Sequence, residues 1–307
     1  MKASIAVCAI IATALMLVPG FISIAYSQDW QSQSPAGVQE YSFNAVSGTA
    51  DGSLYAVGSG GIIWRLQNNS WAQIPSGTTA TLNGLWCSPE GAMYVVGNGG
   101  VILHMKAGIC AAMPSGTTAN LMAIYGSPDG GVFIVGNGGT ILRLQGGNWS
   151  TMPSGTTANL NAVWGCACTG LYAVGNGGVI LRLKGAGWVA MPSGTKANLK
   201  GIWGTADTGV FAVGNGGTIL RLQGRTWSPL FVGPNTNLCA IWSSADDGTF
   251  AVGEGGAILY LQGDKWIAMN TGTAANINAV WGSPEGSVFA AGSKAYILRL
   301  IEAKPSN

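Results

Sequence analysis

The sequence predicts an all-β fold, a seven-bladed β-propeller with four antiparallel strands in each blade. Three observations support this prediction. A Val-Gly or Ala-Gly pair recurs every 39 residues, each repeat holds short apolar runs bounded by turn residues, and no segment shows helical periodicity. The glycines of the seven pairs are Gly58, Gly97, Gly136, Gly175, Gly214, Gly253 and Gly292.

One repeat shows how the four strands are recognised. In the copy from Trp149 to Gly187, apolar runs span 160–164, 171–174 and 179–183, and a more polar run begins at Trp149. Each run has the length of a strand and is rich in Val, Ile, Leu or aromatic residues. Four strands of about five residues plus short connections account for the period.

Asn-Gly pairs lie between the second and third apolar runs at 98–99, 137–138, 176–177 and 215–216. This dipeptide accepts the positive φ angles of a type I′ turn, so we expect a hairpin there with Asn and Gly at its centre. Ser59, Glu254 and Ser293 replace the asparagine in the other three copies.

The two ends of the repeat region predict how the ring closes. A lone segment of the outer-strand type lies at 29–34, before the first full copy, and the last copy ends after its third strand. We therefore expect residues 29–34 to pair with Ile297–Leu300 and to complete the last blade. An open solenoid would need polar capping repeats, which the sequence does not contain.

Composition limits the classes of function. The 307 residues include 12 Trp and are 48% hydrophobic and only 8% charged, with a formal net charge of +2. This composition is typical of a folded chain, and without a basic stripe we expect no nucleic-acid partner. There is one His, and the acidic residues are scattered. We therefore expect no metal, no cofactor and no catalytic residue, hence no enzyme.

The N-terminal 27 residues have the pattern of an export signal. Lys2 precedes an apolar stretch, 3–26, and Ala25-Tyr26-Ser27 is a small-x-small cleavage site. Cleavage after Ser27 would leave a propeller domain at 28–307. An uncleaved membrane anchor is the alternative, because the stretch is long enough to span a bilayer. We expect a secreted or periplasmic protein with no stable membrane span after cleavage.

Five cysteines follow the predicted signal, and none recurs at the repeat period. An odd number does not make a disulfide framework. Cys166 and Cys168 form the one close pair. They could close a small strained loop, bind a soft metal or be incidental turn residues. The sequence favours the last interpretation, because zinc sites normally need four ligands.

Two recurring sets of polar residues are candidate binding residues. An arginine in the third strand of five copies could bind anions or an acidic partner, or could lie over a neighbouring Trp with its head in solvent. An asparagine ends the "SGTTAN"-type loop of five copies, on the face where we also expect the Asn-Gly turns. Such residues either bind ligands or satisfy turn backbones. The sets are Arg65, Arg143, Arg182, Arg221 and Arg299, and Asn120, Asn159, Asn198, Asn237 and Asn276.

A tryptophan recurs on the innermost strand of five copies. A ring of such side chains could stack a sugar or a peptide, but packing between blades is the favoured interpretation, because Trp fills large volumes in protein cores. The residues are Trp86, Trp164, Trp203, Trp242 and Trp281.

The unit W-x-x-x-x-S-G-T-x-x-x-L-x-x-V-W-G, followed by A-V-G-x-x-G-x-I-L-R, covers residues 30–301. It resembles the BNR-like repeat propellers, and is similar to those of the photosystem II stability/assembly factor type and related exported bacterial proteins. The resemblance implies a seven-bladed binding platform or assembly factor without catalysis. The chain lacks the acidic residue of the Asp-box S-x-D-x-G-x-T-W, having "LQGGNW" and "LKGAGW" at that junction. This departure argues against the sialidase branch.

Together these features predict an exported, non-catalytic propeller that binds a protein or assembles a complex. The first alternative is a multivalent lectin that binds a glycan through polar loops and Trp between blades. A glycoside hydrolase is the least favoured alternative, because no pair of carboxylates recurs near the expected axis.

Overall fold

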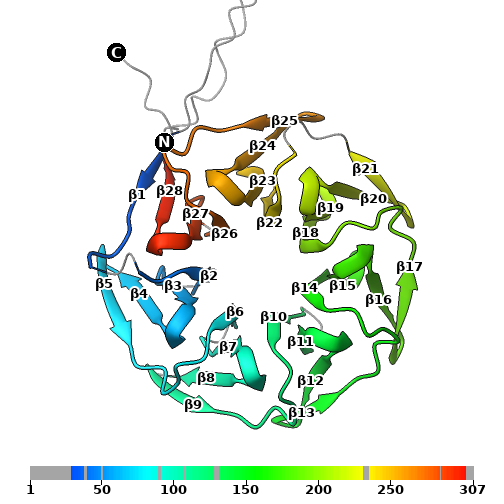
Figure 1. Ribbon diagram of the computed structural model, residues 1–307, viewed down its shortest axis with the longest axis horizontal. Helices are drawn as coiled ribbons and strands as arrows, with labels where there is room; N and C mark the ends of the chain where they lie inside the picture. The colour runs from blue at the N-terminus through cyan, green and yellow to red at the C-terminus, as the bar shows by residue number, and fades with distance from the viewer. Residues whose placement is uncertain are drawn as a thin grey trace, which may run out of the picture.

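The computed structural model describes residues 29–301 except 38–39, 50, 89–90, 107, 128–130, 231–234 and 284. Seven four-stranded antiparallel sheets form a ring around a central axis (Figure 1). The predicted all-β, seven-bladed propeller is thereby confirmed. The predicted export signal, residues 1–27, lies outside the described residues. In the part of the chain that is described, no helix is long and apolar enough to span a bilayer.

Each blade is numbered by the order of its innermost strand, from β2 in blade 1 to β26 in blade 7. The innermost strands are β2 (Phe43–Gly48), β6 (Leu82–Cys87), β10 (Leu121–Gly126), β14 (Leu160–Cys166), β18 (Leu199–Thr205), β22 (Leu238–Ser244) and β26 (Ile277–Gly282). The second strands are β3 (Leu54–Gly58), β7 (Met93–Gly97), β11 (Val132–Gly136), β15 (Gly170–Gly175), β19 (Gly209–Gly214), β23 (Gly248–Gly253) and β27 (Val288–Gly292).

The third strands are β4 (Ile63–Gln67), β8 (Ile102–Lys106), β12 (Ile141–Gln145), β16 (Ile180–Lys184), β20 (Ile219–Gln223), β24 (Ile258–Gln262) and β28 (Ile297–Ile301). The outer strands are β5 (Ser70–Ile74), β9 (Ile109–Ala112), β13 (Asn148–Thr151), β17 (Gly187–Met191), β21 (Thr226–Leu230), β25 (Lys265–Ala268) and β1 (Asp29–Ser32). A one-turn 3₁₀ segment joins second to third strands: η1 (Ser59–Gly61), η2 (Asn98–Gly100), η3 (Asn137–Gly139), η4 (Asn176–Gly178), η5 (Asn215–Gly217), η6 (Glu254–Gly256) and η7 (Ser293–Ala295).

The N-terminal strand closes the ring, as the sequence predicts. β1 pairs antiparallel with β28, with Trp30 opposite Leu300, and the Gln33 N–H donates to the Ile297 carbonyl at 2.7 Å. The Trp30 side chain is buried and meets the Phe250 ring of blade 6 edge-on, with 6.1 Å between centroids. The last blade therefore combines the two ends of the chain (Figure 1).

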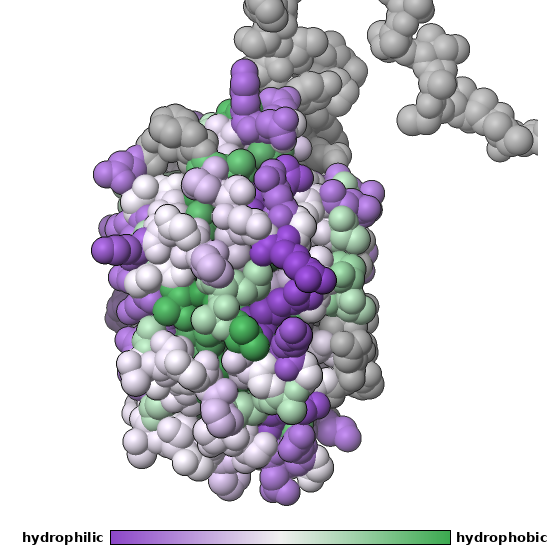
Figure 2. All heavy atoms as spheres, turned by 90° about the vertical axis from the view of Figure 1, so that its right-hand side faces the viewer, coloured by the Kyte–Doolittle hydropathy of each residue, from purple (hydrophilic) through white to green (hydrophobic). Residues whose placement is uncertain are grey.

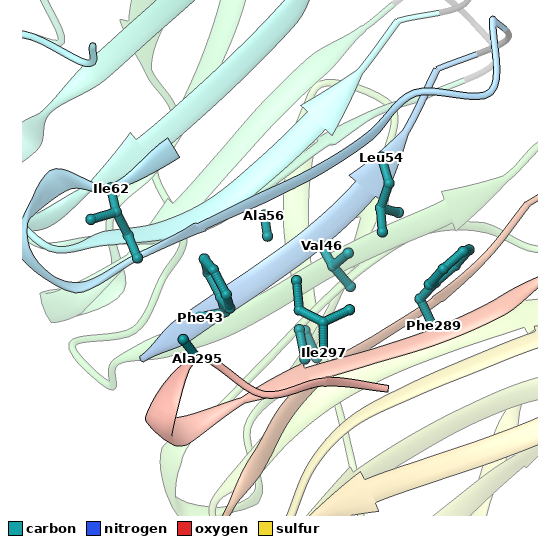
Figure 3. Close-up of a cluster of buried hydrophobic side chains, with 10 residues drawn as sticks. Phe43, Val46, Leu54, Ala56, Ile62, Phe289, Ala295 and Ile297 are labelled. Atoms are coloured by element: carbon teal, nitrogen blue, oxygen red, sulfur yellow. The ribbon is translucent and has the colours of Figure 1, made fainter. Parts of the chain in front are cut away.

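The hydrophobic core lies between the blades. Figure 3 shows the junction of blades 7 and 1, where Phe43 and Val46 lie among buried side chains that include Phe289, Ala295 and Ile297. The second strands are buried along their whole length in three blades and at all but one residue in the other four, because a neighbouring blade covers each side. This burial explains why those strands are continuous apolar runs in the sequence and do not alternate with polar residues.

The turn between second and third strands has its positive φ angles one residue later than predicted. In blade 2 they belong to Gly99 (68°) and Gly100 (77°), and Asn98 is not among the residues with positive φ. The Val101 N–H donates to the Asn98 carbonyl at 3.4 Å, so Asn98 is the first residue of the turn and the two glycines are its centre. The predicted Asn-Gly centre was wrong by one position.

Loops emerge at two faces of the ring. We call the face with the seven 3₁₀ turns and the loops between blades (75–81, 114–120, 153–159 and 192–198 among them) the upper face. The turns between first and second strands, and between third and outer strands, form the lower face. The "SGTTAN"-type loops and the Asn-Gly turns were predicted to lie on one face. This is confirmed, since the Asn120 side chain at the end of one loop contacts the neighbouring turn at Gly99.

Candidate functional site

The five arginines of the predicted set lie in five different blades, and each stacks on an aromatic ring of its own blade. Their guanidinium carbons are 5.4–5.7 Å from the centroids of second-strand Phe or Tyr rings, whereas the ring predicted from the sequence was a Trp. Arg182, for example, stacks on Tyr172 and donates to the Thr169 carbonyl at 3.0 Å in a lower-face turn. The structure therefore gives this set a packing role and does not gather it into one site; ligand binding by it stays a prediction.

The five asparagines of the predicted set join neighbouring blades. The Oδ1 of each accepts an N–H from the first glycine of the turn in the preceding blade, at 2.9–3.0 Å. The backbone carbonyl of the same residue accepts an N–H from the turn of its own blade, as Asn159 does from Asn176 at 2.9 Å. Each asparagine thus holds two upper-face turns in register, and ligand binding by this set also stays a prediction.

Replacing Asn159 by alanine is expected to lower the free energy of unfolding by about 1 kcal/mol, because the Gly138 N–H loses its acceptor. Asn159→Asp keeps an acceptor oxygen at the same place, so we expect it to retain most of the stability. Urea unfolding midpoints of the two variants measure the difference. Equal midpoints for Asn159→Ala and the unaltered chain would contradict the structural role.

The innermost-strand aromatics pack between blades, which confirms the favoured interpretation. Trp203 Nε1 donates to the Ser243 carbonyl of the next blade at 2.9 Å, and the Tyr125 hydroxyl donates to the Gly165 carbonyl. The Trp164 and Trp242 side chains are only 3% and 5% exposed. These two rings are therefore not available to stack a sugar, as the lectin alternative would require.

One hollow on the surface lies outside blade 4. It has a volume of about 840 Å³ and is lined by β17, by residues 177–181 and by the loops at 154–156 and 192–196. Figure 2, which faces the side where β17 lies, shows apolar residues there among hydrophilic ones. A similar hollow occupies the equivalent place on blade 1, at 60–61 and 73–79. This feature belongs to the repeat, so we place the candidate site elsewhere.

The candidate site is a pocket of about 500 Å³ at the upper end of the central axis. All seven blades line it, because the innermost strands converge on the axis (Figure 1). The second residue of each innermost strand forms its wall; these residues are Asn44, Asn83, Met122, Asn161, Lys200, Cys239 and Asn278. We call this pocket the axial mouth.

Four asparagines tie the axial mouth together. Each Nδ2 donates to the carbonyl of the first residue of the next innermost strand, at 2.7–3.0 Å. The second N–H of each amide of Asn83 and Asn161 donates to the Oδ1 of a turn asparagine, Asn98 and Asn176 respectively, at 2.8 and 2.9 Å. Among the described residues no donor is bonded to the Oδ1 of these two side chains. Their amide oxygens remain as acceptors held in fixed positions.

The asparagine pattern breaks on blades 3, 5 and 6, and charge enters the axial mouth at blades 5 and 6. Lys200 and Cys239 take the asparagine position, and Glu254 replaces the first residue of the blade 6 turn. Lys200 and Glu254 are exposed. Burial raises the pKa of the Cys239 thiol, the Glu254 carboxylate raises it further, and the Lys200 ammonium opposes the shift. One sector of the mouth therefore holds a cation, an anion and a thiol.

This wall is not among the residues predicted from the sequence, because the candidate sets were positions that recur in five copies. The signal was present, since the second residue of the innermost strand is Asn in four copies and Met, Lys or Cys in three.

The reactivity of Cys239 tests the charge arrangement. At mildly alkaline pH, Glu254→Gln is expected to speed alkylation of Cys239, because removing the carboxylate favours the thiolate. Lys200→Gln is expected to slow it for the opposite reason. Peptide mapping gives both rates, with Cys110 on the outer strand of blade 2 as the internal reference. Unchanged rates in both variants would show that these charges do not act on the thiol.

The described residues offer little acid, base or metal chemistry. They contain no group of three or more His, Cys, Asp or Glu residues placed to hold a metal. His104, the one histidine of the sequence, stacks on Tyr94 with 4.6 Å between centroids. Glu254 is the only carboxylate among the residues that line the axial mouth. The pair of carboxylates that a glycosidase needs is therefore not found in this lining.

Cys166 and Cys168 form a disulfide, with 5.3 Å between their Cα atoms. The sequence-based preference for two incidental turn residues was wrong. The small loop considered as an alternative is what the structure shows. Cys87, Cys110 and Cys239 are free thiols, and burial raises the pKa of Cys87 to about 12.

Three solved structures of the same fold share little sequence with this chain. YCF48 from Cyanidioschyzon merolae is 14% identical, with a TM-score of 0.71, and the match covers 89% of this chain and 98% of that one. YCF48 bound to D1 peptide is 16% identical, with a TM-score of 0.74, and the match covers 92% and 100%. A catalytically inactive virginiamycin B lyase from Staphylococcus aureus with quinupristin is 16% identical, with a TM-score of 0.78, and the match covers 89% and 98%.

No family model matches the chain, and no curated protein does. At these identities the structural likeness shows the fold alone. YCF48 is a photosystem II assembly factor, so the resemblance of the repeat to propellers of that type is confirmed at the level of the fold.

Proposed function

We propose that this chain is an exported, non-catalytic propeller that binds a peptide segment of a partner protein at the axial mouth and so serves complex assembly. The observation that carries the proposal is the axial mouth itself. Fixed amide oxygens, an exposed lysine and an exposed glutamate line one pocket on a rigid scaffold. These groups match a peptide, whose backbone offers N–H donors and C=O acceptors.

The size of the axial mouth favours a short segment. A volume of about 500 Å³ lies within the range of small-ligand sites and is too small for a folded domain. An extended peptide or a loop tip of the partner would enter from the upper face. A solved propeller of this fold is bound to D1 peptide, which supports peptide binding by such a scaffold.

Export is supported by the apolar stretch at 3–26 and the cleavage tripeptide that ends at Ser27. The test is the N-terminal sequence and intact mass of the protein isolated from its native host. A mature chain that starts at Gln28 and is recovered outside the cytoplasm is expected. A full-length chain recovered from the cytoplasm would refute export and leave peptide binding to be judged separately.

Partner capture tests binding at the axial mouth. The protein is cross-linked in native envelope fractions, and recovered proteins are identified for the unaltered chain, Lys200→Glu and Lys196→Glu. Lys196 is a matched control, because it is an exposed lysine of an upper-face loop that does not line the axial mouth. We expect the same partner with the unaltered chain and Lys196→Glu, and at least tenfold less with Lys200→Glu. Equal recovery with both variants would exclude the axial mouth.

The absence of catalysis has its own test, because a lyase shares the fold. The purified protein is incubated with quinupristin, and the antibiotic is followed by mass spectrometry. We expect no consumption above the rate in buffer. Turnover would refute the non-catalytic part of the proposal.

A further inference from the structure

We propose that the Cys166–Cys168 disulfide is a redox-active site that oxidises one pair of thiols in a substrate protein or peptide for each chain, a stoichiometric exchange that consumes the bridge and is not catalysis. It lies in the lower-face turn between β14 and β15, on the side of the ring opposite the axial mouth. The proposal is therefore independent of peptide binding at the upper face. It rests on the turn geometry, the unequal exposure of the two sulfurs and the groups that contact Cys166.

The turn does not need the disulfide. In the equivalent turns of blades 5 and 6, Thr205 and Ser244 accept an N–H from the residue three positions later, at 3.0 and 2.8 Å. Cys166 Sγ accepts the corresponding N–H from Thr169 at 3.2 Å. Blades 5 and 6 have an aspartate where blade 4 has Cys168. The same turn thus forms without a covalent bond, and the bridge can open while the fold is retained.

The bridge also contributes little to folding. Its cysteines are two residues apart, so it closes a minimal loop and removes little entropy from the unfolded chain. A structural disulfide stabilises the folded state most when it joins segments that are far apart in the sequence. This short bridge is therefore better suited to exchange than to stabilisation.

The two sulfurs differ in access. Cys168 is exposed, whereas Cys166 is half-buried and lines a cavity of about 260 Å³ between blades 3 and 4. An incoming thiolate therefore reaches Cys168, and Cys166 is the leaving group. A leaving thiolate is favoured by nearby donors and positive charge.

Cys166 has such donors. Besides the Thr169 N–H, the Thr169 Oγ1 lies 3.1 Å from its sulfur. The Arg182 guanidinium donates to the carbonyl of the same Thr169 at 3.0 Å, which places a cation beside the turn. These groups favour the thiolate form of Cys166 once the bridge opens.

The exchange balances in two steps. A substrate thiolate attacks Cys168 Sγ, the Cys166–Cys168 bond breaks, and its electron pair passes to Cys166 Sγ, which leaves as a thiolate. The second substrate thiolate attacks the substrate sulfur of the mixed disulfide and releases Cys168. The substrate has lost two electrons and two protons and has gained a disulfide. Cys166 and Cys168 have gained those two electrons and two protons and are now two thiols.

The test uses the full chain and a synthetic peptide that contains two reduced cysteines. Oxidised protein is mixed with excess peptide, and peptide disulfide and protein thiols are counted by alkylation and mass spectrometry. We expect one peptide disulfide and two new thiols, at Cys166 and Cys168, for each chain. A bridge that stays closed would overturn the proposal, and this measurement needs no variant.

A double variant, Cys166→Thr with Cys168→Asp, is the matched control because it copies the turn of blade 5. It is expected to oxidise the peptide at least tenfold more slowly than the unaltered chain. Equal rates would overturn the proposal. The single variants test the direction of attack: Cys166→Ser should form a trapped mixed disulfide with oxidised peptide faster than Cys168→Ser, and the reverse order would contradict it.

Discussion

Gly178→Ala is expected to destabilise the protein by about 4 kcal/mol or more, whereas Gly177→Ala in the same turn should cost only about 1 kcal/mol. Both glycines have positive φ, 68° at Gly177 and 76° at Gly178. An alanine at either position therefore has to adopt a left-handed backbone conformation, which costs free energy for any residue with a Cβ. The difference between them arises from what surrounds the added methyl group.

At Gly177 a Cβ would meet no atom within 4 Å. At Gly178 it would lie 2.0 Å from the carbonyl oxygen of Thr195, in the loop that leads to the next blade. Backbone on both sides cannot move away without opening the junction between blades 4 and 5. The second glycine of the turn is therefore required by the contact between blades, and the first only by the turn.

Urea denaturation of both variants measures this difference. Similar midpoints for the two alanine variants would show that the loop at Thr195 can yield, and that the close approach is not a constraint.

Blade 7 provides a natural comparison. Lys294 and Ala295 take the place of the two glycines there and keep positive φ, at 56° and 51°. Ala295 fits because the loop that faces it is not of the "SGTTAN" type. The N–H of Ala295 donates to the Tyr41 carbonyl of that loop at 2.7 Å. Lys294→Gly is expected to raise the free energy of unfolding by about 1 kcal/mol, since it relieves a left-handed lysine. A fall in the unfolding midpoint would contradict this account.

The strands and the closure of the ring were predictable because they depend on the repeat itself. Continuous apolar runs such as 171–174 identify strands covered on both sides, and the unpaired segment near Trp30 matches the strand that the last copy lacks. The turn was misplaced by one residue for a different reason. Asn-Gly and Gly-Gly overlap in "NGG", and the contact that selects Gly-Gly comes from the next blade.

The axial mouth was not predictable from any single copy. It exists because seven innermost strands converge, so residues 39 positions apart come to share one pocket. Nothing within their own repeats marks Lys200 and Cys239 as functional. Only the convergence of the blades brings this lysine and this thiol beside the Glu254 carboxylate. The recurring arginines and asparagines were easy to find for the opposite reason. They recur because every blade needs the same stacking and the same junction.

A chain that starts at Ala36, without β1, is expected to lose at least as much stability as Trp30→Ala, which should cost about 3–5 kcal/mol. The truncation removes Trp30 from its contact with Phe250 and removes the backbone pairing with β28. It also removes Gln33, whose carbonyl accepts the Trp71 indole N–H at 2.6 Å. Blades 6, 7 and 1 all lose contacts, because the closing strand touches each of them.

The truncated chain should also associate, because β28 becomes an edge with unpaired N–H and C=O groups, and such an edge pairs readily with another chain. Trp30→Ala in the full chain separates the two effects. It leaves a cavity but keeps β1 paired, so its oligomeric state should match that of the unaltered chain. Light scattering and urea unfolding measure both properties, and a peptide of residues 28–36 added to the truncated chain should reverse the association. A truncated chain with an unchanged midpoint and oligomeric state would mean that β1 does not hold the ring closed.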